Sequence, residues 1–204
     1  MPKRASWASR ELAAYLEYCF HDQIDPHTIE GSYAGAFGFG QFIPSSFRAY
    51  AIDFDGDGTR DIWSSQTDAI GSVANYFSRH GWDGESPIAV PVTVTDERAD
   101  QFANQGLKPK RSIAELRKAG VEHVSLPDKT LGALFKLEGR DGWEYWLGLH
   151  DFYVVTRYNH SHMYALAVVQ LSEAVRSRWD DVRKPDRLWS VIIGPVFLEF
   201  WPSP

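Results

Sequence analysis

A run of aromatic residues punctuated by glycine, GSYAGAFGFGQF from Gly31 to Phe42, constrains this chain more than any other stretch. Its glycines permit a positive φ angle and let a second backbone or a ligand approach closely. Pro44 follows Gln41 and indicates the start of a helix. Rings separated by small residues suit a saccharide, because sugar faces pack on rings and sugar hydroxyls need directional partners. From composition alone, however, a pair of tight turns packed against a helix is the favoured interpretation.

Composition limits the class of protein. The chain has 204 residues and a net charge of −6, with eight Trp and nine Tyr. This length suggests one domain, or one domain with a small appendage. The negative charge argues against nucleic acid as a partner, whereas the aromatic residues suit carbohydrate. Cys19 is the single cysteine, so no internal disulfide can form. No run approaches the roughly eighteen apolar residues that a membrane span requires.

Hydrophobic periodicity and cap residues predict helices and strands along the whole chain. Helices are expected at 6–20, from Pro44, and at 67–80, 97–104, 112–119 and 162–178, with strands at 87–95, 133–138 and 144–148. In the first helix, Glu11 and Glu17 are interpreted as solvated charges. The basic turn from Lys108 to Arg111 is interpreted as a solvated loop. In the last helix, a buried stripe is predicted; its members are Val168, Leu171, Ala174 and Val175.

The stretch from Asp53 to Ser64 has the spacing of a calcium-binding loop. Carboxylates stand at its first, third and fifth positions, and Gly58 stands at its sixth, as in an EF-hand. The twelfth position is Ser64, where an EF-hand has a bidentate Glu. The alternative is a hairpin whose Asp-Gly pairs form turns.

Five motifs in order resemble those of the lytic murein transglycosylases. They are GSYAGAFGFGQFIPSS, DFDGDG, W-x4-DAIGSVANYF, HGW and RYNHSHMYALAV, and the resemblance runs from about Ala5 to Trp179. It implies an α+β fold in which a predominantly helical, lysozyme-like SLT domain carries a small appended α+β segment. The domain scheme that follows is a lysozyme-like core at 1–84, an α+β appendage at 85–150, a return to the core at 151–180 and a C-terminal tail of unassigned role at 181–204.

The resemblance implies non-hydrolytic cleavage of the MurNAc-β-1,4-GlcNAc links of peptidoglycan, which leaves 1,6-anhydroMurNAc ends. The family uses one glutamate as general acid and base, in a Glu-Ser/Thr-x-x-Gly context several tens of residues before the glycine run. That motif is absent from this sequence, which starts too late to contain it, so no catalytic residue is assigned. Glu30 lies in a polar connector and is not expected to replace it. The alternative function is a non-catalytic saccharide-binding module or a truncated, inactive homologue.

The resemblance also implies site residues. Residues expected to line the saccharide cleft are Ser32, Gln41, Phe42, Tyr76, Tyr158 and Asn159. A structural calcium ion is expected in the acidic loop, with a later Asp closing its ligand set; the candidate ligands are Asp53, Asp55, Asp57, Thr59 and Asp68. Calcium there would neutralise clustered carboxylates and brace the loop beside the cleft.

Partners and location also follow from the resemblance. Peptidoglycan glycan strands are the expected partner, a cell-wall protein is a further candidate, and the chain is expected to be a monomer. A periplasmic or cell-envelope location is implied, yet the residues after Met1 show no signal peptide. Either the protein is not exported by that route, or Met1 is not the natural beginning of a longer chain. The apolar stretch from Leu188 to Trp201 is expected to dock on the body or to need a partner.

Overall fold

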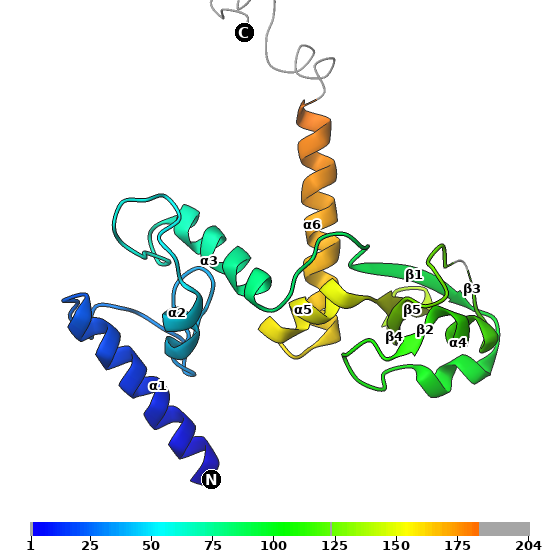
Figure 1. Ribbon diagram of the computed structural model, residues 1–204, viewed down its shortest axis with the longest axis horizontal. Coiled ribbons are helices and arrows are strands. Elements are labelled where there is room, and N and C mark those ends of the chain that lie inside the picture. The colour runs from blue at the N-terminus through cyan, green and yellow to red at the C-terminus, as the bar shows by residue number, and fades with distance from the viewer. Residues whose placement is uncertain (1, 123, 184–204) are drawn as a thin grey trace, which may run out of the picture. The chain divides into compact units, whose positions relative to one another are not determined.

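The computed structural model describes residues 2–122 and 124–183 (Figure 1). Backbone contacts divide the chain into two compact units, one ending at Asp83 and the other beginning at Gly84. The mixture of helices with an antiparallel sheet confirms the predicted α+β class. Within the described ranges, no helix is both long and apolar enough to cross a membrane. The predicted docking of residues 188–201 lies outside the described residues.

Three helices form the regular part of the first unit: α1 (Pro2–His21), α2 (Pro44–Tyr50) and α3 (Gln66–Arg79). They confirm the helices predicted in this part of the chain. Pro44 occupies the first turn of α2, where its missing N–H is no loss. Ser65 caps α3, because its side chain accepts a hydrogen bond from the N–H of Asp68 at 3.1 Å.

Four aromatic rings form the centre of the first unit. The Phe47 ring lies 4.4 Å from that of Tyr18, 5.4 Å from that of Phe37 and 6.0 Å from that of Trp63, centroid to centroid. Phe47 is almost completely buried. Tilted ring pairs at these distances each contribute roughly 0.5–1.5 kcal/mol beyond the area that they bury. The cluster thereby joins α1, the glycine run, α2 and the end of the acidic loop.

The buried face of α1 differs from the apolar face of its sequence. Leu12, Leu16 and Phe20 are exposed, Phe20 to 81%. Glu11 is only 9% exposed, so its interpretation as a solvated charge is wrong. The Ser45 N–H donates to Glu11 Oε2 at 2.9 Å and the Ser45 hydroxyl to Oε1 at 3.0 Å. The carboxylate therefore satisfies a free N–H of the first turn of α2, which no local side chain caps.

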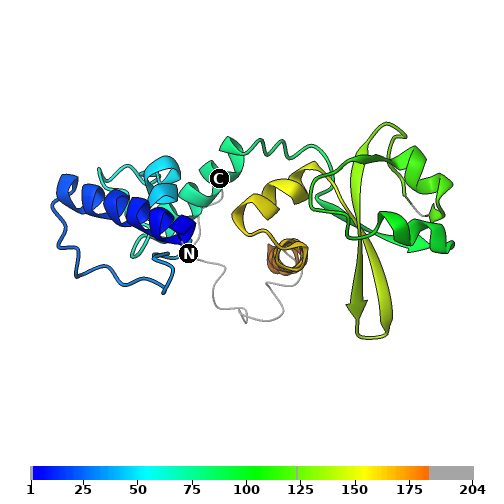
Figure 2. The same ribbon diagram turned by 90° about the horizontal axis from the view of Figure 1, so that it is seen from below.

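The second unit is built on a five-stranded sheet of order β2-β4-β5-β1-β3, in which every pair of neighbours is antiparallel. Its strands are β1 (Ala89–Val94), β2 (Arg111–Ser112), β3 (Val121–Glu122), β4 (Leu131–Gly139) and β5 (Gly142–Gly148). β4 and β5 form a hairpin that pairs Gly139 with Gly142 (Figure 2). This sheet confirms the strands predicted at 87–95, 133–138 and 144–148.

Helices cover both faces of this sheet. The 3-10 helix η1 (Glu97–Phe102) and α4 (Ile113–Lys118) pack with Leu134 and Leu147 in one apolar core. On the other face, Phe135 packs on Phe152 of α5 (His150–Tyr158) with 5.1 Å between ring centroids. Successive residues of β4 therefore pack into apolar cores on opposite faces of the sheet. The predicted return of residues 151–180 to the first unit stays a prediction, since their contacts cluster with the second.

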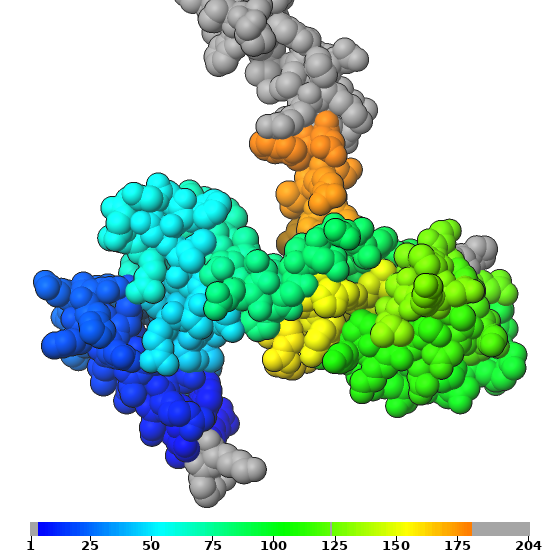
Figure 3. Space-filling view, in the orientation of Figure 1, coloured from blue at the N-terminus to red at the C-terminus, as the bar shows by residue number. Residues whose placement is uncertain are grey.

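The last helix, α6 (His162–Arg183), is longer than predicted and buries a different stripe. Ala165, Leu166 and Val169 are buried, whereas Leu171 is 65% and Val175 61% exposed. The predicted stripe is therefore wrong at these positions, because only the first turns of α6 lie against the rest of the unit. The second half of α6, orange in Figure 3, extends away from the sheet.

A charged cluster joins η1 to the sheet. Lys136 Nζ donates to Asp100 Oδ2 and the Tyr145 hydroxyl donates to Asp100 Oδ1, both at 2.6 Å. The hydrogen bond from Lys136, helped by that from Tyr145, lowers the pKa of Asp100, and the same bond raises the pKa of Lys136. Because the carboxylate is favoured in the folded state, its ionisation stabilises the fold.

The buried cap on α2 gives a first prediction. Glu11→Ala leaves the Ser45 N–H without its acceptor, so we expect it to lower the free energy of unfolding by about 1–3 kcal/mol. Glu17→Ala is the matched control, because Glu17 lies on the same helix in an exposed ion pair with Arg48. We expect a loss below about 1 kcal/mol there. Urea denaturation of both variants measures the difference, and equal losses would contradict a buried cap.

The charged cluster predicts a pH dependence. The pKa of Asp100 is lower in the folded state than in the unfolded state, so its stabilisation is complete above roughly pH 4 and is lost as pH falls through the folded value. We expect Asp100→Asn to melt below the parent chain at pH 7, with the difference shrinking in acid. Glu138→Gln, at an exposed position of β4, is the control. A difference that stays constant from pH 7 to 3 would refute this role.

Candidate functional site

The glycine run folds into tight turns. Phe37 and Phe42 exchange backbone hydrogen bonds of 3.0 and 3.1 Å, and Phe37 also bridges to Gly31. Gly38 has a φ of +71°, and a Cβ there would lie 2.7 Å from the carbonyl oxygen of Ile62. Only glycine fits, because the acidic loop ends directly against this backbone. The tight turns that composition favours are thus present, and they place the aromatic side chains of the run on different sides.

Gln41 has a left-handed backbone with a φ of 49°. Its N–H and its side-chain amide both donate to the Gly38 carbonyl oxygen, at 3.1 and 3.0 Å. A non-glycine residue in this region carries conformational strain of about 1–3 kcal/mol, which is typical of functional sites. The strained turn holds an exposed amide in a fixed position on the surface of the unit.

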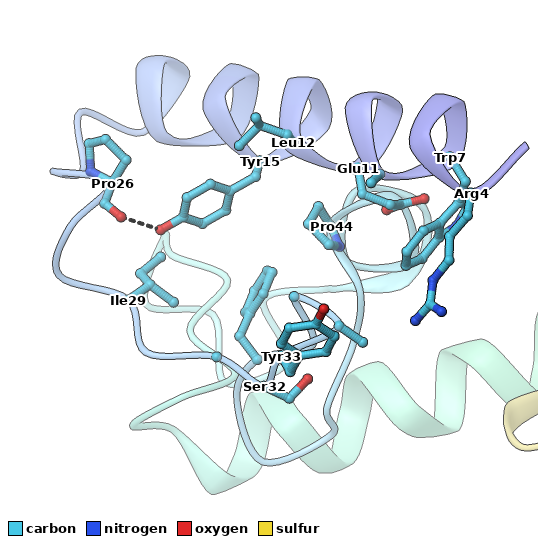
Figure 4. Close-up of a pocket in the computed structure, with 15 residues that line it drawn as sticks. Arg4, Trp7, Glu11, Leu12, Tyr15, Pro26, Ile29, Ser32, Tyr33 and Pro44 are labelled. Atoms are coloured by element: carbon cyan, nitrogen blue, oxygen red, sulfur yellow. Dashed lines mark hydrogen bonds between the residues drawn. The ribbon is translucent and has the colours of Figure 1, made fainter. Parts of the chain in front are cut away.

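A cavity of about 650 Å³ lies between α1 and the glycine run (Figure 4). Trp7, Tyr15 and Tyr33 give it aromatic walls, and Tyr33 is fully exposed. The Tyr15 hydroxyl donates to the Pro26 carbonyl oxygen at 2.7 Å, which fixes its ring against the connector. Ser32 and Glu11 add polar groups. The size and the mixed lining are typical of a small-molecule or saccharide site.

The structure places the predicted cleft residues of the first unit in three environments. Ser32 lies on the wall of the cavity, and its hydroxyl accepts a hydrogen bond from the N–H of Ala36 at 3.1 Å. Gln41 lies at the end of the glycine run. Phe42 and Tyr76 are only 3% and 8% exposed, with their rings 6.0 Å apart. These two rings support the glycine run from the interior, and their contact with a ligand stays a prediction.

Tyr158 and Asn159 belong to the second unit. Tyr158 is the last residue of α5, and Asn159 follows as the cap residue with extended backbone. The sequence did not predict α5 as a helix, although its residues contribute much of the core beneath the sheet. The role of this pair at a saccharide cleft stays a prediction.

The acidic loop brings three carboxylates together. Asp53, Asp55 and Asp68 each offer an oxygen, and these atoms all lie within 4.8 Å of one another. Oxygens around a calcium ion lie 2.3–2.6 Å from it, so such a group matches one coordination shell. Asp57 stands outside this group, because its Oδ1 accepts the Thr59 N–H at 2.8 Å and hydroxyl at 2.6 Å. The loop thus assembles three of the five candidate ligands.

Asp68 connects this loop to α3. It is fully buried, and its two oxygens accept hydrogen bonds from the N–H groups of Phe54 at 2.8 Å and Asp61 at 2.9 Å. The Phe54 N–H is the main cause that holds the pKa of Asp68 below its ordinary value, against the opposing effect of burial. Gly71 of α3 makes room, since a Cβ there would lie 2.4 Å from the Phe54 ring. The buried carboxylate is therefore ionised at neutral pH, and these hydrogen bonds fix its direction.

Sequence reasoning missed most of the cavity wall. Arg4, Trp7, Glu11 and Tyr15 lie three or four residues apart along α1, so they form one stripe of that helix toward the cavity. The signal was present in the spacing, but the stripe mixes charged and aromatic residues. A search for apolar periodicity selects Leu12, Leu16 and Phe20, of which only Leu12 lines the cavity.

Comparison with known proteins places the chain in a family. The model of the transglycosylase SLT domain matches residues 1–173. The chain is 45% identical over 179 residues to membrane-bound lytic murein transglycosylase B of Escherichia coli, covering 85% of the chain and 47% of that protein. It therefore spans about half the length of this relative.

Solved structures of lytic transglycosylases are also similar to this chain. The lytic transglycosylase Slt35 of Escherichia coli, in complex with calcium, matches 87% of the chain and 56% of its own length at 44% identity, with a TM-score of 0.79. SltB3 of Pseudomonas aeruginosa, in complex with NAG-anhNAM-pentapeptide, matches 82% of the chain and 45% of its own length at 35% identity, with a TM-score of 0.72. The lysozyme-like part of the predicted fold and the resemblance drawn from the five motifs are confirmed, and the chain belongs to the transglycosylase SLT domain family.

Proposed function

We propose that this chain binds the glycan strands of peptidoglycan in the cell envelope and contributes the substrate cleft of a lytic transglycosylase. The observation that carries the proposal is the aromatic cavity beside the glycine run, in a chain of this family. Trp7 and Tyr33 offer ring faces for pyranose rings, and Ser32 offers a hydroxyl. Because the SltB3 relative was solved with a peptide-bearing disaccharide, the proposed ligand includes glycan that carries peptide stems.

The proposed reaction is non-hydrolytic cleavage of the MurNAc-β-1,4-GlcNAc link. One carboxyl group donates its proton to the glycosidic oxygen, and the resulting carboxylate takes the proton of the C6 hydroxyl. That oxygen then closes on C1 and gives the 1,6-anhydro end. General acid and base assistance of this kind contributes about 10²–10⁴ in rate. The reaction therefore needs a carboxyl group with a free oxygen at the cleft.

A second function, binding without cleavage, is favoured by the state of Glu11. Glu11 is the one carboxylate among the described residues that line the cavity, and both of its oxygens accept hydrogen bonds from Ser45. A carboxylate held in this way caps α2, and both of its oxygens are engaged by Ser45. Binding alone requires only the aromatic walls and polar groups that the cavity has.

We also propose that the acidic loop binds a structural calcium ion. Asp53, Asp55 and Asp68 would supply three oxygens, and Asp57 and Thr59 would complete the set as the loop adjusts. The ion would neutralise charges that otherwise repel one another. Since Ile62, close to the end of this loop, lies against Gly38, bracing the loop also fixes the glycine run.

Digestion of purified murein sacculi separates the two functions. For a transglycosylase, mass spectrometry of the soluble products should show 1,6-anhydro muropeptides. For a binding module, sacculi should retain the chain on sedimentation while their products stay unchanged. Trp7→Ala should weaken retention about tenfold or more, because a stacked ring contributes roughly 1–3 kcal/mol. Phe20→Ala, at an exposed ring outside the cavity lining, is the control. If no 1,6-anhydro muropeptides form and the sacculi do not retain the chain, the proposal is rejected.

Calcium occupancy predicts a thermal shift. At free calcium one hundred times the dissociation constant, binding adds about 2.7 kcal/mol of stability, or roughly 5–10 °C in Tm. A chelator should reverse the shift, and Asp53→Asn with Asp55→Asn should abolish it. Glu97→Gln, in the second unit, should keep the full shift. A melting curve that does not respond to calcium or chelator would show that the loop is metal-free.

A further inference from the structure

A second cavity lies wholly within the second unit. It has a volume of about 420 Å³ and is bounded by the end of η1, the loop 105–110, β2 and the start of β4. We name it the anion pocket. Its polar lining consists of Lys108, Lys110, Arg111, Gln101 and Gln105, with Phe102 and Gly132 beside them. The basic turn that the sequence indicates as a solvated loop therefore forms the wall of a cavity.

The positive charge of the anion pocket is largely uncompensated. Among the described residues, no carboxylate lies within ion-pair distance of Lys108 or Lys110. The nearest acidic residue of η1, Asp100, is already bonded to Lys136 and Tyr145. In a chain of net charge −6, a cavity with unpaired cations is a local reversal of sign. Such a cavity attracts anions and repels other cations.

Arg111 is held in an orientation that suits a carboxylate. Its guanidinium lies 5.0 Å from the centre of the Phe102 ring, so a cation–π contact fixes the planar group. Glu115 approaches it only at 3.9 Å, and the Ser112 N–H and hydroxyl donate to the other Glu115 oxygen at 2.8 and 2.9 Å. A planar guanidinium with free N–H groups binds carboxylates through two parallel hydrogen bonds.

Backbone pairing with β4 supports the wall of the pocket. The Lys110 N–H donates to the Gly132 carbonyl oxygen at 3.2 Å, and Arg111 pairs with Gly132 across the strands. Pro109 fixes the backbone between the two lysines. Lys110 and Arg111 thus lie on backbone that is bonded to β4, and Lys108 lies in the bend before it. Little ordering of the bonded backbone is required when a ligand binds.

We propose that the anion pocket binds the carboxylates of the peptide stems of peptidoglycan. This inference rests on the proposed function. In a strand that carries stems, the glycan rings present neutral hydroxyl and acetamido groups, because the lactyl carboxyl of MurNAc is bound in an amide. The peptide stem presents carboxylates together with amides. The cations match the carboxylates of the stem, and the side-chain amides of Gln101 and Gln105 match its amides. A membrane surface fits less well, because it calls for four to eight basic residues on an exposed face rather than three around a cavity.

Isothermal titration of the full chain tests this assignment. The probes are GlcNAc-MurNAc-pentapeptide, the peptide-free disaccharide with its lactyl carboxylate amidated, the free pentapeptide, and the pentapeptide with amidated carboxylates. We expect K108Q/K110Q to weaken binding of the two pentapeptide ligands with free carboxylates about tenfold or more, and to leave binding of the amidated, peptide-free disaccharide unaffected. K129Q/R140Q removes the same charge from exposed positions of the same unit and should bind like the parent chain. K108R/K110R should retain the affinity, which excludes a folding defect.

The outcomes are distinct. Equal affinity for the free and the amidated pentapeptide, or unchanged binding by K108Q/K110Q, would overturn the anion pocket and leave the glycan proposal intact. If the parent chain binds the free pentapeptide more tightly than the amidated one but does not bind the peptide-free disaccharide, the anion pocket is kept and the proposed function is rejected. Phosphatidylserine vesicles that bind the parent chain but not K108Q/K110Q, together with no binding of the pentapeptide, would assign the pocket to a membrane surface and overturn the proposal.

Discussion

The packing of three rings around Phe47 is the contact on which the first unit depends. Tyr18 comes from α1, Phe37 from the glycine run and Trp63 from the end of the acidic loop, so segments that are far apart in the sequence meet at one ring. Each of these segments carries one part of the site: a cavity wall, the strained turn or the carboxylates. Short segments with few helical turns cannot hold such positions by themselves, because isolated elements of this length are marginally stable.

Two carboxylates complete this arrangement, and each does so by bonding to backbone N–H groups. Glu11 satisfies the start of α2, and Asp68 satisfies the loop before α3. A buried carboxylate would be costly without such partners, whereas a bonded one is both stable and fixed in direction. The same chemistry separates their roles. Glu11 is engaged by one residue, Ser45, whereas Asp68 bonds to the loop backbone and has an oxygen within 4.8 Å of oxygens of Asp53 and Asp55.

The sequence predicted the positions of helices and strands better than it predicted which side of each helix is buried. Helical periodicity located α1 and α3 because it depends on local spacing, and the cap residue Ser112 marks the start of α4. Which side of a helix is buried depends on what packs against it, and this is not encoded locally. On α1 the buried side carries Glu11, since the partner is a helix terminus with free N–H groups. On α6 the apolar positions beyond Val169 face no packed surface of the described residues.

The same limit applies to charge. The turn from Lys108 to Arg111 has the composition of a solvated loop, and only the pairing of Arg111 with Gly132 turns it into the wall of a cavity. A strongly hydrated lysine at an exposed turn attracts an anion only weakly, because salt screens the electrostatic interaction over about 10 Å at 0.1 M. Cations that line one cavity beside a stacked guanidinium act at shorter range and with defined geometry. A chain with net negative charge can therefore still select a carboxylate, provided that the anion enters the pocket itself.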